Sequence, residues 1–311
     1  MMITRLCFAF ILGLCAVVPA KAASSLEDKI LSIGVLSTKP QKHIRFTQPL
    51  GDYLADNLRE FGYTRAEIKV SSNVEQLSQW FDQGEVDLMS ETLFTSLDLA
   101  NNHNAEIILR RWKKGVAEYR SLFFTRADSG ITSFDDLVGK HLALEDVDST
   151  SGYYIPLSTL LQRGYAVTKL ASSHTPVPEG HIGYVITADT LSEADELSLS
   201  AWVFRKKVDA AAFNDGNWNS PSDMPKSMRD HMHILYESPA FPRSVQLIRA
   251  DMPDNIKTQI RGLLLNAHLS TAGQKALEAF QDTKKFDNFS EENQEAMAYA
   301  DKLLLLVKKH L

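Results

Sequence analysis

Stretches typical of β-strands alternate with stretches typical of α-helices along most of this 311-residue chain, and this limits the folds open to it. Short apolar runs such as Ile30–Leu36 and Val86–Met89 are typical of strands. Between such runs, apolar residues recur at helical spacing, as they do in Phe46, Leu50, Tyr53, Leu54, Leu58 and Phe61. The alternation indicates an α/β protein with mostly parallel sheets.

The first 22 residues have the features of a secretory signal peptide. An apolar run, Leu6–Val18, is followed by a small-residue cleavage signal at 20–22. The run is too short to span a membrane. Cys15 raises the alternative of a lipoprotein, but Leu14 is too bulky for the usual lipoprotein signal. We therefore expect cleavage after Ala22 and a soluble periplasmic protein.

Cysteine content and charge exclude several kinds of function. Both cysteines, Cys7 and Cys15, lie in the expected signal peptide, so the mature chain would have no disulfide, reactive thiol or cysteine metal site. Without Arg5 and Lys21, 31 Lys and Arg remain against 39 Asp and Glu, a net charge of −8. Such an acidic chain is a poor nucleic-acid binder.

The chain also lacks the usual motifs of an enzyme. Its nine histidines are scattered, and neither an HExxH nor a GxSxG motif is present. His231 and His233 alternate as neighbours on a strand would, but two such residues alone make a weak metal site. We therefore expect a binding protein with no catalytic residue, no metal and no cofactor.

The expected mature chain, 23–311, is long enough for two lobes of ordinary domain size. Extended segments near 119–125 and 233–242 look like two crossings between such lobes. Two crossings predict a discontinuous first lobe, made of 23–122 and 236–311, and a continuous second lobe, 123–235.

The segment Asp148–Tyr153 (Asp-Ser-Thr-Ser-Gly-Tyr) lies between a strand-like run and a helix-like run. Ser, Thr and Asp are preferred at the first positions of helices, so a capped helix start explains the segment. The N-terminus of a helix also attracts anions, because its N–H groups are free and its dipole is positive there. From these residues alone, both interpretations remain open.

Several segments together resemble the phosphonate/phosphate/phosphite-binding family of periplasmic ABC-transporter proteins. The resemblance covers nearly the whole mature chain, and its most specific motif is the Ser-Thr-Ser-Gly segment. It is carried by Tyr119–Ser121, Arg126–Ile131, Ser133–Lys140, Asp148–Tyr153, Val208–Asp215, Glu237–Pro239 and Arg249–Pro253.

The resemblance implies a type II periplasmic binding-protein fold, in which two α/β lobes joined by a two-strand hinge close over a ligand. It implies that Ser149, Thr150 and Ser151 hold an oxyanion. Tyr119 would cover the ligand, or pack as a hinge aromatic. Asp215 would face an amino group of the ligand, or serve only its Asn-Asp-Gly turn.

The first lobe offers further donors at the ends of its expected strands. Ser37 and Thr38 follow the first strand, and Ser71 follows the second. Lys39 would add positive charge there, or lie solvated on the surface. We expect the three hydroxyl residues to contact the ligand.

Two positions depart from the family pattern. Ser90 and Glu91 stand where a Gly-Pro pair is usual, and 193–196, with Glu193 and Glu196, stands where a histidine is often found. A carboxylate repels a phosphonate dianion unless a cation pairs with it. Glu91 would either start a helix and point outward, or contact a positive group of the ligand, as in an aminoalkyl phosphonate.

The expected function is therefore the solute-binding component of an ABC importer, acting as a monomer on a small oxyanion, most simply a phosphonate. Its partners would be that ligand and a membrane permease. The alternative is a sensory protein of the same fold that signals to a membrane receptor or histidine kinase, because a fold alone does not fix a function.

Overall fold

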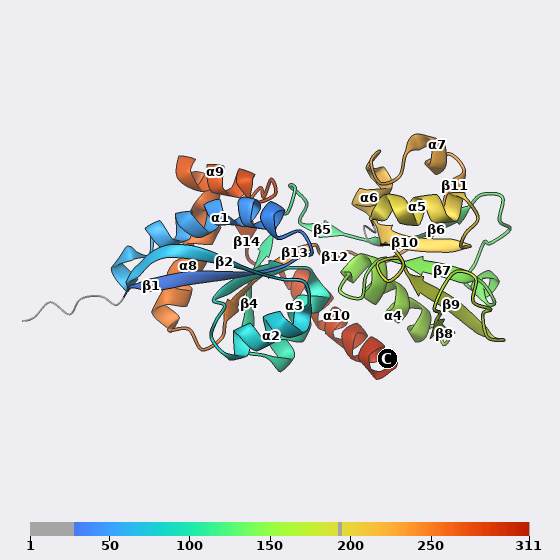
Figure 1. The fold of residues 1–311 in the computed structure, drawn as a ribbon, viewed down its shortest axis with the longest axis horizontal. Helices are drawn as coiled ribbons and strands as arrows, with labels where there is room; N and C mark the ends of the chain where they lie inside the picture. Colours follow the sequence, from blue (N-terminus) through green and yellow to red (C-terminus); the bar gives the residue numbers. More distant parts are fainter. Residues whose placement is uncertain (1–27, 192–194, 311) are drawn as a thin grey trace, which may run out of the picture.

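The chain forms two α/β lobes joined by a pair of short strands (Figure 1). The computed structural model describes residues 28–191 and 195–310. The expected signal peptide and Glu193 lie outside these residues. The α/β fold with two lobes, expected from the sequence, is confirmed.

The first lobe contains one six-stranded sheet. Its strands, in spatial order, are β14 (Phe286–Asp287), β4 (Ala105–Arg111), β13 (Ser244–Arg249), β3 (Leu88–Glu91), β1 (Lys29–Leu36) and β2 (Tyr63–Ser71). Strand β1 pairs in parallel with both β2 and β3. Strand β13 runs antiparallel to β3 and β4, and β14 runs antiparallel to β4.

Helices cover both faces of this sheet, because each face presents apolar side chains to be buried. The helical elements of the lobe are α1 (Pro40–Asp56), η1 (Arg59–Phe61), α2 (Val74–Asp82), α3 (Leu93–Asn102), α8 (Asp254–Asn266), η4 (Ala267–Leu269) and α9 (Thr271–Ala279). Leu50 and Leu54 of α1 pack with α8 and α9 residues in one core cluster. Leu77 and Phe81 of α2 pack with Leu99 of α3 in another.

The second lobe contains the other six-stranded sheet. Its strands, in spatial order, are β11 (Met232–Glu237), β6 (Ser121–Arg126), β10 (Ala210–Asn214), β7 (His141–Leu144), β9 (His181–Ile186) and β8 (Ala166–Lys169). The helical elements are η2 (Asp135–Leu137), η3 (Thr150–Tyr154), α4 (Ile155–Gln162), α5 (Glu196–Phe204), α6 (Asp215–Asn219) and α7 (Lys226–Arg229). Strand β6 runs antiparallel to both of its neighbours, β10 and β11.

The two chain crossings pair with each other between the lobes. Strand β5 (Glu118–Tyr119) lies antiparallel to β12 (Phe241–Pro242), with Tyr119 opposite Phe241. Each crossing leads directly into an antiparallel strand, β6 or β13. The expectation of mostly parallel sheets is therefore only partly met, since both sheets are mixed.

The C-terminal helix α10 (Glu291–His310) packs against both lobes, through α3 and α4 (Figure 1). Leu303 and Leu304 of α10 share a buried cluster with Phe94 of α3 and Ile155 of α4. Tyr299 of α10 donates a hydrogen bond to Gln162 of α4 at 2.8 Å. The lobes are thus in contact behind the strand pair as well as connected by it.

Some elements differ from those expected from the sequence. Strands β4, β9 and β14 were not expected, and the single strand expected over 119–125 is divided into β5 and β6 at Arg120. The second sheet begins at Ser121 and ends at Glu237, two residues outside the expected 123–235 at each end. Strands β4 and β14 form by pairing over long sequence distances, which local periodicity does not encode.

Candidate functional site

The Ser-Thr-Ser-Gly segment lies where β7 ends and a wide helical turn, η3, begins before α4. Ser149 is the N-cap of η3, and its Oγ accepts a hydrogen bond from the Gly152 N–H at 3.0 Å. The capping interpretation of this segment is therefore confirmed. The same hydroxyl donates to Oε2 of Glu145 at 2.6 Å. An internal carboxylate thus lies against the turn that the sequence indicated as an anion site.

Gly152 is required at this turn by the close approach of that carboxylate. A Cβ at position 152 would lie 2.6 Å from Oε2 of Glu145 and 2.7 Å from its Cβ. Any larger residue would have to displace the Glu145 side chain. The glycine therefore lets a carboxylate, or another oxyanion in its place, approach the backbone of the turn.

The other two hydroxyl residues join the turn to the first lobe and to the strand pair. Thr150 is fully buried, and its Oγ1 accepts a hydrogen bond from the Phe94 N–H at the start of α3 at 3.1 Å. Tyr119 of β5 is buried, and its hydroxyl interacts with the side chains of Thr150 and Ser151. Burial raises the pKa of Tyr119, so its phenol stays protonated. The structure therefore brings Ser149, Thr150, Ser151 and Tyr119 together.

Carboxyl groups gather around this turn. Burial, reinforced by the charge of Glu196, raises the pKa of Glu145 to about 7. Burial, reinforced by Asp146 and Glu91, raises the pKa of Asp148 to about 7 as well. Both groups are thus partly protonated at neutral pH, and a neutral carboxyl can donate a hydrogen bond.

Because its pKa is raised by folding, Glu145 makes the free energy of unfolding depend on pH. The pKa of Glu145 is about 7 in the folded chain against 4.5 ordinarily. Its contribution to the free energy of unfolding is therefore fully present below pH 4.5 and is lost as the pH rises through 7. Between pH 4.5 and pH 8, the difference in free energy of unfolding between Glu145→Gln and the wild type should shift by about 3 kcal/mol in favour of the variant, because only the wild type must ionise a buried carboxyl. Urea titrations at both pH values measure this difference. The exposed Glu278→Gln is the control, and a pH-independent difference for Glu145→Gln would contradict the assignment.

Asp215 lies at the first position of α6, close to the chain crossing. Its Oδ1 accepts from the Gly216 N–H at 2.9 Å, and its own N–H donates to the carbonyl of Arg120 at 3.0 Å. Glu196 lies at the first position of α5 and accepts from Nδ2 of Asn217 at 3.1 Å. Asp215 therefore bonds the backbone at the start of α6, whereas Glu196 bonds a side chain of α6 and its charge also acts on Glu145 at the turn.

On the first lobe, a cavity of about 150 Å³ opens at the carboxyl ends of β1 and β3. Its lining includes His43, Glu91, Thr92, Arg111 and Lys113. Oε1 of Glu91 accepts a hydrogen bond from the Thr92 N–H at 2.7 Å. Glu91 thus satisfies a backbone group at the start of α3 and also lines the cavity, so it does not simply point outward.

Ser37, Thr38 and Ser71 lie at the ends of β1 and β2, as expected, but their hydroxyls make local bonds or face solvent. Oγ of Ser37 accepts from the Lys39 N–H at 2.9 Å, and Oγ of Ser71 bonds the backbone of Asn73. Thr38 is exposed. The structure does not bring these three hydroxyls to the turn at Ser149.

The sequence did not lead us to two cations of the cavity, Arg111 at the end of β4 and Lys113 just after it. The signal was present, because four basic residues in Arg110–Lys114 follow the apolar run Ile107–Leu109. Side chains alternate along an extended strand. Arg111 and Lys113 therefore face the cavity, whereas Arg110 and Trp112 face the opposite way.

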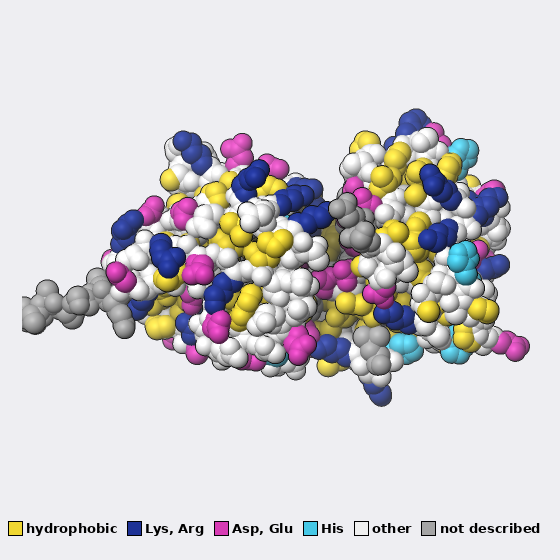
Figure 2. Space-filling view, viewed as in Figure 1, with side chains coloured by type: hydrophobic (Ala, Val, Ile, Leu, Met, Phe, Trp, Pro, Cys, Tyr) yellow, Lys and Arg dark blue, Asp and Glu magenta, His cyan; other side chains and the backbone are white. Residues whose placement is uncertain are grey.

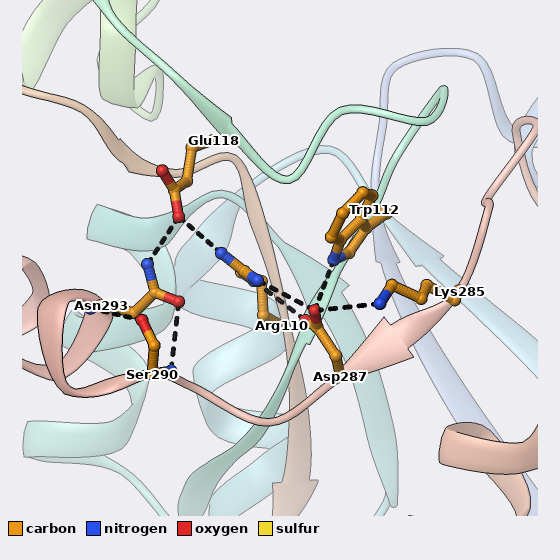
Figure 3. Close-up of polar contacts among 7 residues, drawn as sticks. All are labelled: Arg110, Trp112, Glu118, Lys285, Asp287, Ser290 and Asn293. Carbon is orange, nitrogen blue, oxygen red and sulfur yellow. Dashed lines mark hydrogen bonds and ion pairs between the residues drawn. The ribbon is translucent and has the colours of Figure 1, made fainter.

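Arg110 and Trp112, which face away from the cavity, belong to a polar network that attaches strand β5, the first chain crossing, to the first lobe (Figure 3). Arg110 makes a two-pronged contact with Asp287 of β14, at 2.9 Å for each bond, and a third bond to Glu118 of β5 at 2.5 Å. Nε1 of Trp112 donates to Asp287 at 2.8 Å, and Asn293 of α10 donates to Glu118 at 2.7 Å. Strand β5 is thereby bound to β4, β14 and α10.

Figure 2 shows the hollow between the lobes, with Lys and Arg side chains on the rim of the first lobe and Asp and Glu side chains gathered below them. Across the described ranges, no helix is long and apolar enough to cross a membrane. The same residues hold no cluster of three or more His, Cys, Asp or Glu side chains suited to a metal ion.

Comparison with known proteins identifies the family. Residues 33–294 match the model of the periplasmic substrate-binding proteins of phosphonate ABC transporters. Among solved structures, XAC2383 from Xanthomonas citri bound to chloride ion is 29% identical, with a TM-score of 0.85 over 91% of this chain and 99% of that one. The same protein bound to ATP aligns at 28% identity over 91% and 99% of the two chains, with a TM-score of 0.84.

Two more distant structures share the fold. PhnD1 from Prochlorococcus marinus in complex with methylphosphonate is 14% identical over 89% of this chain and 99% of that one, with a TM-score of 0.62. A binding protein component of an ABC phosphonate transporter from Pseudomonas aeruginosa is 17% identical over 92% and 90%, also with a TM-score of 0.62.

Proposed function

Because the chain belongs to the family of periplasmic substrate-binding proteins of phosphonate ABC transporters, we propose that it captures a small oxyanion by closing its two lobes. The simplest ligands are a phosphonate, phosphate or phosphite. Family membership makes the chain a binding protein rather than an enzyme, with a small-molecule ligand and a membrane permease as partners. The sensory alternative gains no support from this membership. In our proposal the protein works as a monomer.

One observation carries the proposal: the Ser149–Ser151 turn lies at the junction of the lobes, where Tyr119 and the start of α3 also meet it. A helix start supplies N–H groups and a positive dipole end to an anion. Ligand oxygens would take the place that the Glu145 carboxylate now occupies against Ser149. At neutral pH the partly protonated Glu145 would then donate to the ligand rather than repel it.

The ligands of relatives are consistent with this chemistry. Methylphosphonate and ATP both carry phosphorus oxyanions, and chloride is itself an anion. Strands β5 and β12 provide a two-strand connection about which the lobes can rotate. Closure would exclude water from the bound anion and so strengthen its hydrogen bonds.

The test is a thermal-shift screen of the mature protein at neutral pH. Phosphate, phosphite, methylphosphonate, aminoethylphosphonate and methanesulfonate are compared with a neutral sugar. We expect at least one phosphorus oxyanion to raise Tm in proportion to the logarithm of its concentration, because ligands that bind only the folded state stabilise it. If no anion raises Tm while the neutral solute does, the proposal is wrong. A preference for aminoethylphosphonate would support contact with Glu91 or Asp215.

A further inference from the structure

The cavity in the first lobe contains a buried cation that has no carboxylate beside it. Arg111 is only 2% exposed. Within the described residues, no carboxylate oxygen lies within 4.0 Å of a nitrogen of Arg111 or Lys113. Burying a charge without a partner costs several kcal/mol, so proteins rarely do so without a reason.

The guanidinium of Arg111 is held rigidly by the residues after α9. Its Nε donates to Oγ1 of Thr283 at 2.9 Å, and its Nη2 donates to the carbonyl of Phe280 at 2.8 Å. Its Cζ lies 3.6 Å from the centre of the Phe280 ring. Among the contacts of the described chain, Nη1 makes none. The group is therefore oriented in advance, with one donor edge left for another acceptor.

The backbone that holds Arg111 is itself strained. Gln281, whose Oε1 accepts from Nη2 of Arg111 at 3.2 Å, has a φ of 56°, and Asp282 has a φ of 50°. Left-handed backbone is uncommon at non-glycine residues and costs free energy, and strained positions of this kind tend to cluster at functional sites. Gln281 also lines the cavity. The strained residues are thus the ones that help to hold the Arg111 guanidinium in place.

Positive charge exceeds negative charge around the cavity. Burial and the charge of Arg111 lower the pKa of Lys113 to about 8, and burial lowers the pKa of Arg111 to about 9. Arg243 is near enough to lower both values further, whereas Glu91 acts in the opposite sense. Glu91 is the one acidic residue of the lining, and one of its oxygens is already bonded to Thr92. Two cations of the lining, Arg111 and Lys113, therefore outnumber its one carboxylate, and Arg243 adds positive charge nearby.

The cavity adjoins the turn of the second lobe. Thr92 lines the cavity, and its Oγ1 lies 3.5 Å from the carbonyl of Asp148, next to Ser149. The cavity volume, about 150 Å³, is several times the volume of a water molecule, about 30 Å³. One ligand with two charged ends could therefore reach both places.

We infer that the cavity of Arg111 and Lys113 is a second anion subsite, so that the natural ligand carries two anionic groups. One group binds the Ser149–Ser151 turn, and the other binds between Arg111 and Lys113 of the first lobe. The chemical class is a compact bis-anion, such as a pyrophosphate or a phosphonate with a second acid group. This inference rests on the proposed function and adds the charge pattern of the ligand.

The test compares ligands that have one anionic group with ligands that have two. Calorimetric titrations use inorganic phosphate and methylphosphonate against pyrophosphate and phosphonoacetate. In the wild type, at least one bis-anion should bind about tenfold or more tightly than either single-group anion, because each hydrogen bond to a charged group contributes about 1.5–3 kcal/mol. Lys113→Met should remove that advantage while leaving phosphate and methylphosphonate within about twofold.

Lys113 is chosen because, unlike Arg111, it does not support the loop after α9. Lys275→Met, an exposed lysine on α9, changes the net charge equally and should leave all affinities unchanged. If the wild type binds both kinds of anion equally, or if Lys113→Met weakens both kinds equally, the second subsite is wrong while the proposed function stands. If none of the four anions binds, the proposed function fails and this inference fails with it.

Discussion

Asp287→Ala is expected to lower the free energy of unfolding by about 3 kcal/mol, as measured by urea denaturation followed by circular dichroism. The Asp287 carboxylate accepts two hydrogen bonds from Arg110 and one from Trp112. The Arg110 side chain is only 11% exposed, so removing Asp287 leaves a largely buried guanidinium with Glu118 as its remaining partner. The loss of a buried partner costs far more than the loss of an exposed one.

Asp230→Ala is the matched control for this prediction. Asp230 pairs with Lys226 on the surface of the second lobe, at 2.8 Å, and both side chains are more than half exposed. Exposed pairs contribute about 0–1 kcal/mol, so this variant should be nearly as stable as the wild type. Equal losses for the two variants would show that the Arg110 network does not anchor strand β5 to the first lobe.

Much of this architecture follows from local sequence. The strand–helix alternation predicts the two α/β lobes, and the extended segments around Tyr119 and Pro239 predict the two crossings. The cap at Ser149 was predicted as well, because capping depends on residues within one turn of the helix. Local chemistry of this kind can be read from neighbouring residues alone.

The residues that were missed depend on distant contacts. Arg111 becomes buried because Phe280 and Thr283, about 170 positions later in the chain, fold over it. The basic run Arg110–Lys114 shows that cations follow the strand, but nothing near Arg111 in the sequence shows that this one is buried. Glu145 likewise looks like an ordinary surface acid until folding buries it and brings Glu196, about 50 positions later, near it. The mixed sheets have the same origin, since β13 pairs with strands from a distant part of the chain.

The second large expected effect is on ligand affinity, in the double variant Ser149→Ala/Thr150→Val. Each of these hydroxyls would contribute a hydrogen bond of about 1.5–3 kcal/mol to a bound oxyanion, so removing both should weaken binding about 10²–10⁴-fold. Thr150 also accepts the Phe94 N–H bond, and some loss of stability is therefore expected. Circular dichroism at the temperature of the titration verifies that the variant is folded.

Thr132→Val/Ser133→Ala provides the matched control for that variant. These two residues form a similar hydroxyl pair in the same lobe, where they bind only Asp136. Thr150→Ser is a second control, because it keeps the hydroxyl. Both controls should bind the anion with wild-type affinity. They separate a general effect of removing hydroxyl groups from the second lobe from the specific loss of the Ser149 and Thr150 hydroxyls.

The most direct measurement of oxyanion capture at this turn is a calorimetric titration of methylphosphonate and inorganic phosphate into the wild type and the Ser149→Ala/Thr150→Val variant. We expect saturable binding of at least one anion to the wild type, and at least about a hundredfold weaker binding to the folded variant. Unchanged affinity in the double variant would contradict it, because the anion would then be held somewhere other than the turn between the lobes.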